Sequence, residues 1–151
     1  MVPDFKQLRV LGHPAHVPLT HFPLALWTIA FLGDLVYAWS GTLFWRSFAF
    51  WNIVCGLGIG SLTLCTGFYD YLFIPENKLF AAKTATLHMM VMLGATCLFG
   101  VSLYFHRGTE PLTHFHLMMA LLFSGTGTLL LHWGGWLGGQ LVYRHGLGYD
   151  L

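Results

Sequence analysis

Charged side chains are scarce in this chain of 151 residues. Only 9% of the residues are Asp, Glu, Lys or Arg and 56% are hydrophobic, whereas about a quarter of a soluble domain is charged. The net charge is +1, so the chain lacks the excess of basic residues that is typical of nucleic-acid binding. The composition therefore excludes an ordinary soluble domain, predicts no nucleic-acid partner, and favours a protein that lies in a lipid bilayer.

Cysteines and metal-binding motifs are also few. Cys55, Cys65 and Cys97 fall inside long apolar runs, where thiols usually serve as small apolar side chains, so a disulfide framework is not expected. The sequence has no CxxCH motif, which excludes covalent attachment of c-type haem. It also has no HExxH motif, which excludes the commonest zinc-protease helix.

The sequence consists mostly of four long apolar runs. A helix of about 20 apolar residues is long enough to cross a bilayer. These predicted spans cover about residues 18–39, 48–73, 84–105 and 112–133. Little else remains, so we expect one domain over residues 1–151 with an all-α fold, an integral membrane four-helix bundle. The GGWLGG stretch at 134–139 is expected to end the fourth helix, and the residues after it to form a short C-terminal interfacial segment.

The distribution of basic residues predicts an orientation. Four spans place both termini on the same side of the membrane. The side of the termini carries Lys6, Arg9, Lys78, Lys83 and Arg144, and the other side carries only Arg46 and Arg107. Because basic residues concentrate in cytoplasmic loops, we expect a multi-pass membrane protein with both termini in the cytoplasm.

Histidines gather at the helix ends on the side of the termini. Six of the nine lie there together with Asp70: His13, His16, His21, His88, His132 and His145. Ionisable groups inside a membrane are costly, so they indicate a functional site unless they are paired or solvated. Interfacial hydrogen bonding is the favoured explanation for the shallower residues His13, His16 and His145.

The deeper histidines fit the ligation of haem b, which takes two imidazoles on opposite sides of a flat macrocycle and cations near its propionates. His21 and His88 lie on different helices at similar depth and are the expected iron ligands, with His132 and His16 as alternatives. His13, His145 and Arg144 are expected beside the cofactor. A tighter cluster, in which His13 and His16 join His21 or Asp70, would instead bind zinc, copper or non-haem iron.

Further polar residues lie elsewhere in the predicted bundle. Asp34, in the middle of the first span, is expected to pair with a hydroxyl or a tyrosine across the bundle, or to carry protons. His106, His114 and His116 lie on the side opposite the termini. A second cofactor there is a weaker possibility, because His114 and His116 are two residues apart and point to different helix faces.

The chain resembles a small four-span membrane family labelled domain of unknown function 2231. The likeness rests on HPAHVPLTHFP at 13–23, TGFYD at 66–70, His88, and GGWLGGQLVYRHG at 134–146. It implies a four-helix membrane architecture, and its motif positions fall on His13, His16, His21, Asp70, His88, Gly138, Gly139, Arg144 and His145. The opening and closing motifs both end on the side of the termini, so we expect them to face each other across one site.

The functional hypothesis is a membrane subunit that binds haem b and carries electrons within, or to, a larger redox complex. The segments outside the spans are short, so we expect an electron-transfer or accessory role, with catalysis in another membrane or redox subunit. Two alternatives remain open. One is a membrane protein that handles protons or a non-haem metal, and the other is a structural subunit whose polar groups hold helices together.

Overall fold

The computed structural model describes residues 6–107 and 111–147. Four helices make up most of it: α1 (His16–Ser40), α2 (Leu43–Leu72), α3 (Leu79–His106) and α4 (His114–Tyr143). Each is long and apolar enough to cross a membrane. The prediction of an all-α membrane four-helix bundle is confirmed.

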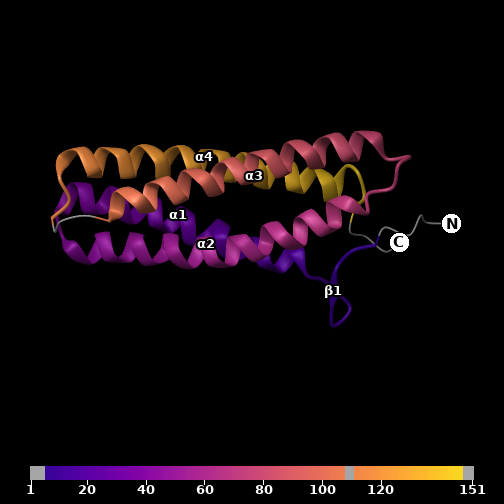
Figure 1. Ribbon diagram of the computed structural model, residues 1–151, viewed down its shortest axis with the longest axis horizontal. Coiled ribbons are helices and arrows are strands. Elements are labelled where there is room, and N and C mark those ends of the chain that lie inside the picture. The colour runs from indigo at the N-terminus through magenta and orange to yellow at the C-terminus, as the bar shows by residue number, and fades with distance from the viewer. Residues whose placement is uncertain (1–5, 108–110, 148–151) are drawn as a thin grey trace.

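The helices alternate in direction and form two hairpins, α1–α2 and α3–α4 (Figure 1). The N- and C-terminal segments and the α2–α3 connection lie at one end of the bundle, which we call the terminal end. The α1–α2 and α3–α4 connections lie at the other, which we call the loop end. Helices within a hairpin pack more extensively than helices of different hairpins. The weakest seam of the bundle therefore runs between the two hairpins.

A small β-hairpin precedes α1 at the terminal end, and the sequence did not predict it. It pairs β1 (Arg9–Val10) with β2 (His13–Pro14) in antiparallel register. The turn has positive φ angles at Leu11 (52°) and Gly12 (84°). The amide of Leu8 donates to Oδ1 of Asp70 at 2.9 Å, which fixes this segment to the last turns of α2.

The expectation that GGWLGG ends the fourth helix is wrong, because α4 continues through it to Tyr143. These glycines serve close packing: a Cβ at Gly134 would collide with the Met92 side chain, and one at Gly138 would lie 3.2 Å from Cε1 of His88. The bilayer adds a second reason, because backbone exposed to lipid must satisfy its hydrogen bonds within a helix.

The two hairpins repeat one another. Both α2 and α4 have 30 residues. Buried residues recur at constant offsets. Four buried residues of α1 have a buried equivalent in α3, each 72 residues later: Pro23 and Ala95, Trp27 and Phe99, Ala30 and Ser102, and Asp34 and His106. Four buried residues of α2 have a buried equivalent in α4, each 71 residues later: Ala49 and Ala120, Ile53 and Ser124, Gly56 and Gly127, and Gly60 and Leu131. Because both hairpins run in the same direction, an approximate twofold axis along the bundle relates them.

The centre of the bundle lies on this axis. Trp27 stacks on its equivalent Phe99, with ring centroids 4.6 Å apart and planes 14° from parallel. Each ring fits against an equivalent glycine of its own hairpin, Trp27 against Gly56 and Phe99 against Gly127. Small residues thus allow helices to approach closely, which is how membrane helices associate.

The contact between Trp27 and Gly56 leads to a testable prediction. A Cβ at position 56 would overlap the indole ring, whereas one at Gly58 meets no atom within 4 Å. We expect Gly56→Ala to lower the free energy of unfolding by about 1–3 kcal/mol through overpacking. Gly58→Ala should leave it unchanged or raise it by up to about 1 kcal/mol, because alanine is the better helix former. Thermal unfolding in detergent, followed by circular dichroism, measures both; equal effects would contradict the close contact.

Candidate functional site

His16 occupies the first turn of α1 at the terminal end, where it contacts α2. Its Nδ1 lies 3.0 Å from the carbonyl oxygen of Thr63 and 3.3 Å from the hydroxyl of Thr66. The ring rests on Gly67, where a Cβ would lie 2.6 Å from Cε1. A carbonyl oxygen only accepts hydrogen bonds, so Nδ1 carries the proton and Nε2 keeps its lone pair.

His88 repeats this arrangement in the second hairpin. Its Nδ1 donates to the carbonyl oxygen of Gly134 at 2.8 Å, and its ring rests on Gly138. Gly134 and Gly138 lie 71 residues after Thr63 and Gly67, the offset that relates α4 to α2. The twofold axis therefore relates the two imidazoles, and each is fixed in the same tautomer by the same kind of contact.

The two imidazoles share the properties of metal ligands. Within the described residues, Nε2 of His16 and Nε2 of His88 have no hydrogen-bond partner. Both side chains are half-buried. A histidine that ligates a metal commonly donates its other ring N–H to a backbone carbonyl, which fixes the ring and raises its basicity.

The expected partner His21 does not face this site. Its side chain is exposed, and Nδ1 bonds to the carbonyl oxygen of Val17 on its own helix at 3.0 Å. An α-helix turns about 100° per residue, so His21 points about 140° away from His16. His132 is also exposed and bonds to Thr128 of its own helix at 2.9 Å. His16, the alternative that the sequence offered, is the histidine whose contacts match those of His88.

The remaining predicted residues surround the terminal end without converging on the imidazoles. His13 is exposed on β2, and Arg144 is exposed at the end of α4. Nε2 of His145 lies 3.1 Å from the hydroxyl of Thr84 on α3. Within residues 6–107 and 111–147, no three or more His, Cys, Asp or Glu side chains come together as a metal site. The expected tight cluster around His13, His16 and Asp70 is therefore not assembled.

A second polar cluster lies buried near the loop end, and all four helices contribute to it. Oδ1 of Asp34 lies 2.7 Å from Nε2 of His106, and Oδ2 accepts from the hydroxyl of Ser124 at 2.8 Å. Nδ1 of His106 donates to the carbonyl oxygen of Ser102, and the guanidinium of Arg46 donates to the carbonyl oxygen of His106, both at 2.8 Å. The expectation of a hydroxyl partner for Asp34 is confirmed; the His106 partner was not predicted.

The hydrogen bonds of this cluster determine where its protons lie. Nδ1 of His106 must donate, because its partner is a carbonyl oxygen. One further proton must therefore lie between Nε2 of His106 and Asp34. Both nitrogens of His106 are occupied, so it does not join His114 and His116 at a second cofactor; His114 is exposed and His116 bonds to Thr113 at the start of α4. We interpret the cluster as a structural connection between the helices.

Comparison with known proteins identifies a family but no characterised relative. The model of a family described as predicted membrane protein (DUF2231) matches residues 12–151. The match includes all four helices and both imidazoles of the site. No curated protein and no solved structure matches the chain.

Proposed function

This chain belongs to the DUF2231 family of predicted membrane proteins, and we propose that it binds one b-type haem between its two hairpins. In this proposal Nε2 of His16 and Nε2 of His88 would bind the haem iron. The observation that carries the proposal is the symmetric pair of imidazoles: each Nδ1–H donates to a carbonyl oxygen, and no residue within 6–107 and 111–147 bonds to either Nε2. Two such groups, one from each hairpin, suit a ligand that lies on the twofold axis.

The number of ligands favours haem over zinc or copper. A zinc site takes three or four protein ligands, whereas haem iron already has four nitrogen ligands from its macrocycle and needs two more. Two imidazoles meet this need, and the described residues do not bring a third ligand to them. The donor set is therefore that of a haem site with histidine on both faces.

The packing of the bundle also suits a planar guest. The seam between the hairpins is less extensive than the packing within them, so a flat group inserted there disturbs the fewest contacts. Gly67 and Gly138 let each imidazole lie against the neighbouring helix of its own hairpin.

Ligation by two histidines points to electron transfer. Haem would supply a one-electron redox centre, and His16 and His88 would hold it from both sides, which would leave no iron position open to a substrate. We therefore propose an accessory subunit that passes electrons within, or to, a larger redox complex, with catalysis in another chain. Five of the seven basic residues lie at the terminal end, which supports a cytoplasmic location of both termini and of the haem side of the bundle.

An absorbance scan of the purified protein tests the proposal. Haem predicts a Soret band and, after addition of dithionite, a sharp α band. Elemental analysis of the same sample tests the alternative of a metal bound without haem. If the bands are missing and zinc, copper or iron is present at one ion per chain, the site binds a metal without haem. If neither is found, the proposal is overturned in favour of a structural subunit.

A further inference from the structure

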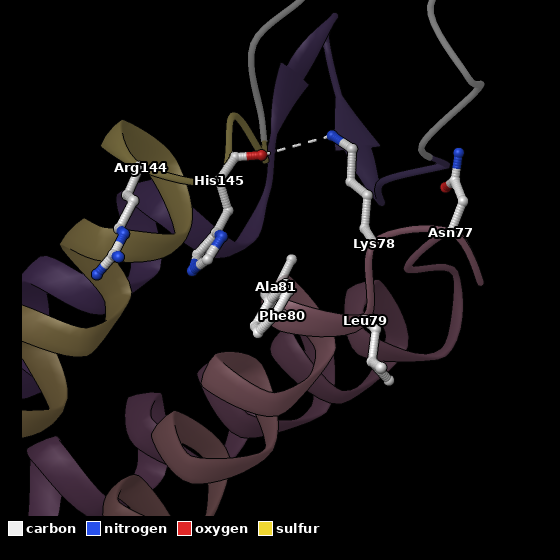
Figure 2. Close-up of a pocket in the computed structure, with 7 residues that line it drawn as sticks. All are labelled: Asn77, Lys78, Leu79, Phe80, Ala81, Arg144 and His145. Carbon is white, nitrogen blue, oxygen red and sulfur yellow. Dashed lines mark hydrogen bonds between the residues drawn. The ribbon is translucent and has the colours of Figure 1, made fainter.

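A cavity of about 220 Å³ lies at the terminal end, where the start of α3 meets the end of α4 (Figure 2). Asn77, Lys78 and the first residues of α3 line one side, and Arg144 and His145 line the other. Neither imidazole of the proposed haem site lines it. The cavity is therefore a separate feature of the bundle.

The walls of the cavity carry positive charge. Lys78 and Arg144 both line it, and among residues 6–107 and 111–147 no acidic side chain does. The Lys78 ammonium reaches across to the backbone carbonyl of His145 at 3.5 Å, as Figure 2 shows. His145 also contacts Thr84 through Nε2 at 3.1 Å. These contacts join the start of α3 to the residues after α4, which lie far apart in sequence.

The backbone adds to this charge. Lys78 is the N-cap residue of α3 and makes no side-chain cap, so the first N–H groups of that helix are available beside the cavity. The start of a helix carries a partial positive charge. The two cationic side chains and the helix dipole therefore act in the same direction, and they favour a compact anion with several acceptor oxygens.

The surroundings of the cavity are apolar. Leu79 is 60% exposed, Phe80 76% and Tyr143 84%, and all three lie at ends of membrane-spanning helices. A basic pocket at such a place is suited to a lipid headgroup, whose acyl chains run along the exposed side chains. A free phosphate would satisfy the charges but not these apolar groups.

We propose that this cavity binds a phosphate group, supplied by an anionic phospholipid at the membrane surface. Lys78 and Arg144 contact the phosphate oxygens, and Leu79 and Phe80 lie against the acyl chains. The site is independent of the haem proposal, because it shares no residue with it. Its role is to bind anionic lipid where α3 and α4 meet.

Lipid binding to the full-length protein in detergent micelles tests the proposal. Native mass spectrometry, titrated with phosphatidylglycerol or phosphatidylcholine, measures affinity. We expect the wild type to prefer phosphatidylglycerol, and Lys78→Gln and Arg144→Gln each to weaken its binding about fivefold, since a basic residue at a membrane surface contributes about 1 kcal/mol. Lys83→Gln is the matched control. It removes an exposed charge one turn further along α3 that does not line the cavity, and should leave the affinity unchanged.

Two outcomes overturn the proposal: wild-type affinity in both Lys78→Gln and Arg144→Gln, or an equal loss in Lys83→Gln, which would show general surface attraction only. Inorganic phosphate, added as a competitor, identifies the source of the ligand. If it does not displace phosphatidylglycerol at millimolar concentration, the site is a lipid site. If it displaces the lipid at equal concentration, the cavity binds phosphate without the acyl chains and the lipid part of the proposal fails.

Discussion

Replacing His88 by alanine is expected to abolish haem incorporation while the four helices stay folded in the membrane. The substitution removes one of the two imidazoles that we propose as haem ligands, the one whose Nδ1–H donates to the carbonyl oxygen of Gly134. Loss of a group that merely orients a ligand commonly weakens metal binding 10–100-fold, so loss of the ligand itself should weaken it by more than about 100-fold. The haem-to-protein ratio after purification and the helical circular dichroism signal measure the two parts of this prediction.

The twofold repeat supplies matched variants for this experiment. His16→Ala should have the same effect as His88→Ala, because the two imidazoles occupy equivalent positions. His21→Ala and His132→Ala remove exposed side chains that bond only to their own helices and should keep wild-type haem content. Full haem content in His88→Ala would show that His88 is not a ligand. Loss of haem in His21→Ala would instead support His21 and His88, the pair expected from the sequence.

Asp34→Ala is expected to lower the free energy of unfolding by about 3–5 kcal/mol, the usual cost of removing one partner from a buried charged pair. The exposed fraction of Asp34 is 1% and that of His106 is 2%, so His106 would lose its Oδ1 contact without gaining water. Ser124→Ala removes a single hydrogen bond to Oδ2 and should cost about 1 kcal/mol. Thermal unfolding in detergent compares the three proteins.

A double-mutant cycle separates the pair from its surroundings. His106→Ala alone should destabilise the bundle about as much as Asp34→Ala, because each leaves the other group buried without its partner. The double variant Asp34→Ala with His106→Ala should destabilise the bundle by less than the sum of the two single effects, because neither group is then left buried without its partner. Strictly additive single effects would show that the 2.7 Å contact contributes nothing to stability.

Length and hydropathy were enough to predict the spans and the end of the bundle at which the histidines gather. They did not predict which face each histidine occupies, because membrane helices are apolar on nearly every side and give no amphipathic pattern to orient them. His16 and His21 are about one and a half turns of α1 apart and differ in the face that they occupy. The packing of His16 on Gly67 distinguishes this half-buried imidazole from the exposed side chain of His21.

The prediction that the GGWLGG glycines end the fourth helix was wrong for a related reason. In soluble proteins a run such as GGWLGG punctuates helices, whereas in a bilayer the helix continues and glycine marks a close contact. Gly134 and Gly138 lie where Met92 and His88 occupy the space of a side chain. Those contacts come from another helix, so the sequence of α4 alone does not reveal them.

The internal repeat did leave a signal in the sequence. His16, Trp27 and Asp34 follow one another at spacings of 11 and 7 residues, and His88, Phe99 and His106 repeat these spacings. Comparison of the two halves of the chain would have paired His16 with His88 and Asp34 with His106. The signal is weak because few equivalent residues are identical; those that are include the two histidines and the glycines on which they rest, Gly67 and Gly138.

The electron paramagnetic resonance spectrum of the oxidised protein, recorded at known concentration, tests the central claim most directly. It reports both the axial ligands and the number of haems. The geometry of His16 and His88 predicts one low-spin ferric haem with two imidazole ligands in each chain. A high-spin signal, or no haem signal at all, would contradict the claim that these two residues hold one guest on the twofold axis.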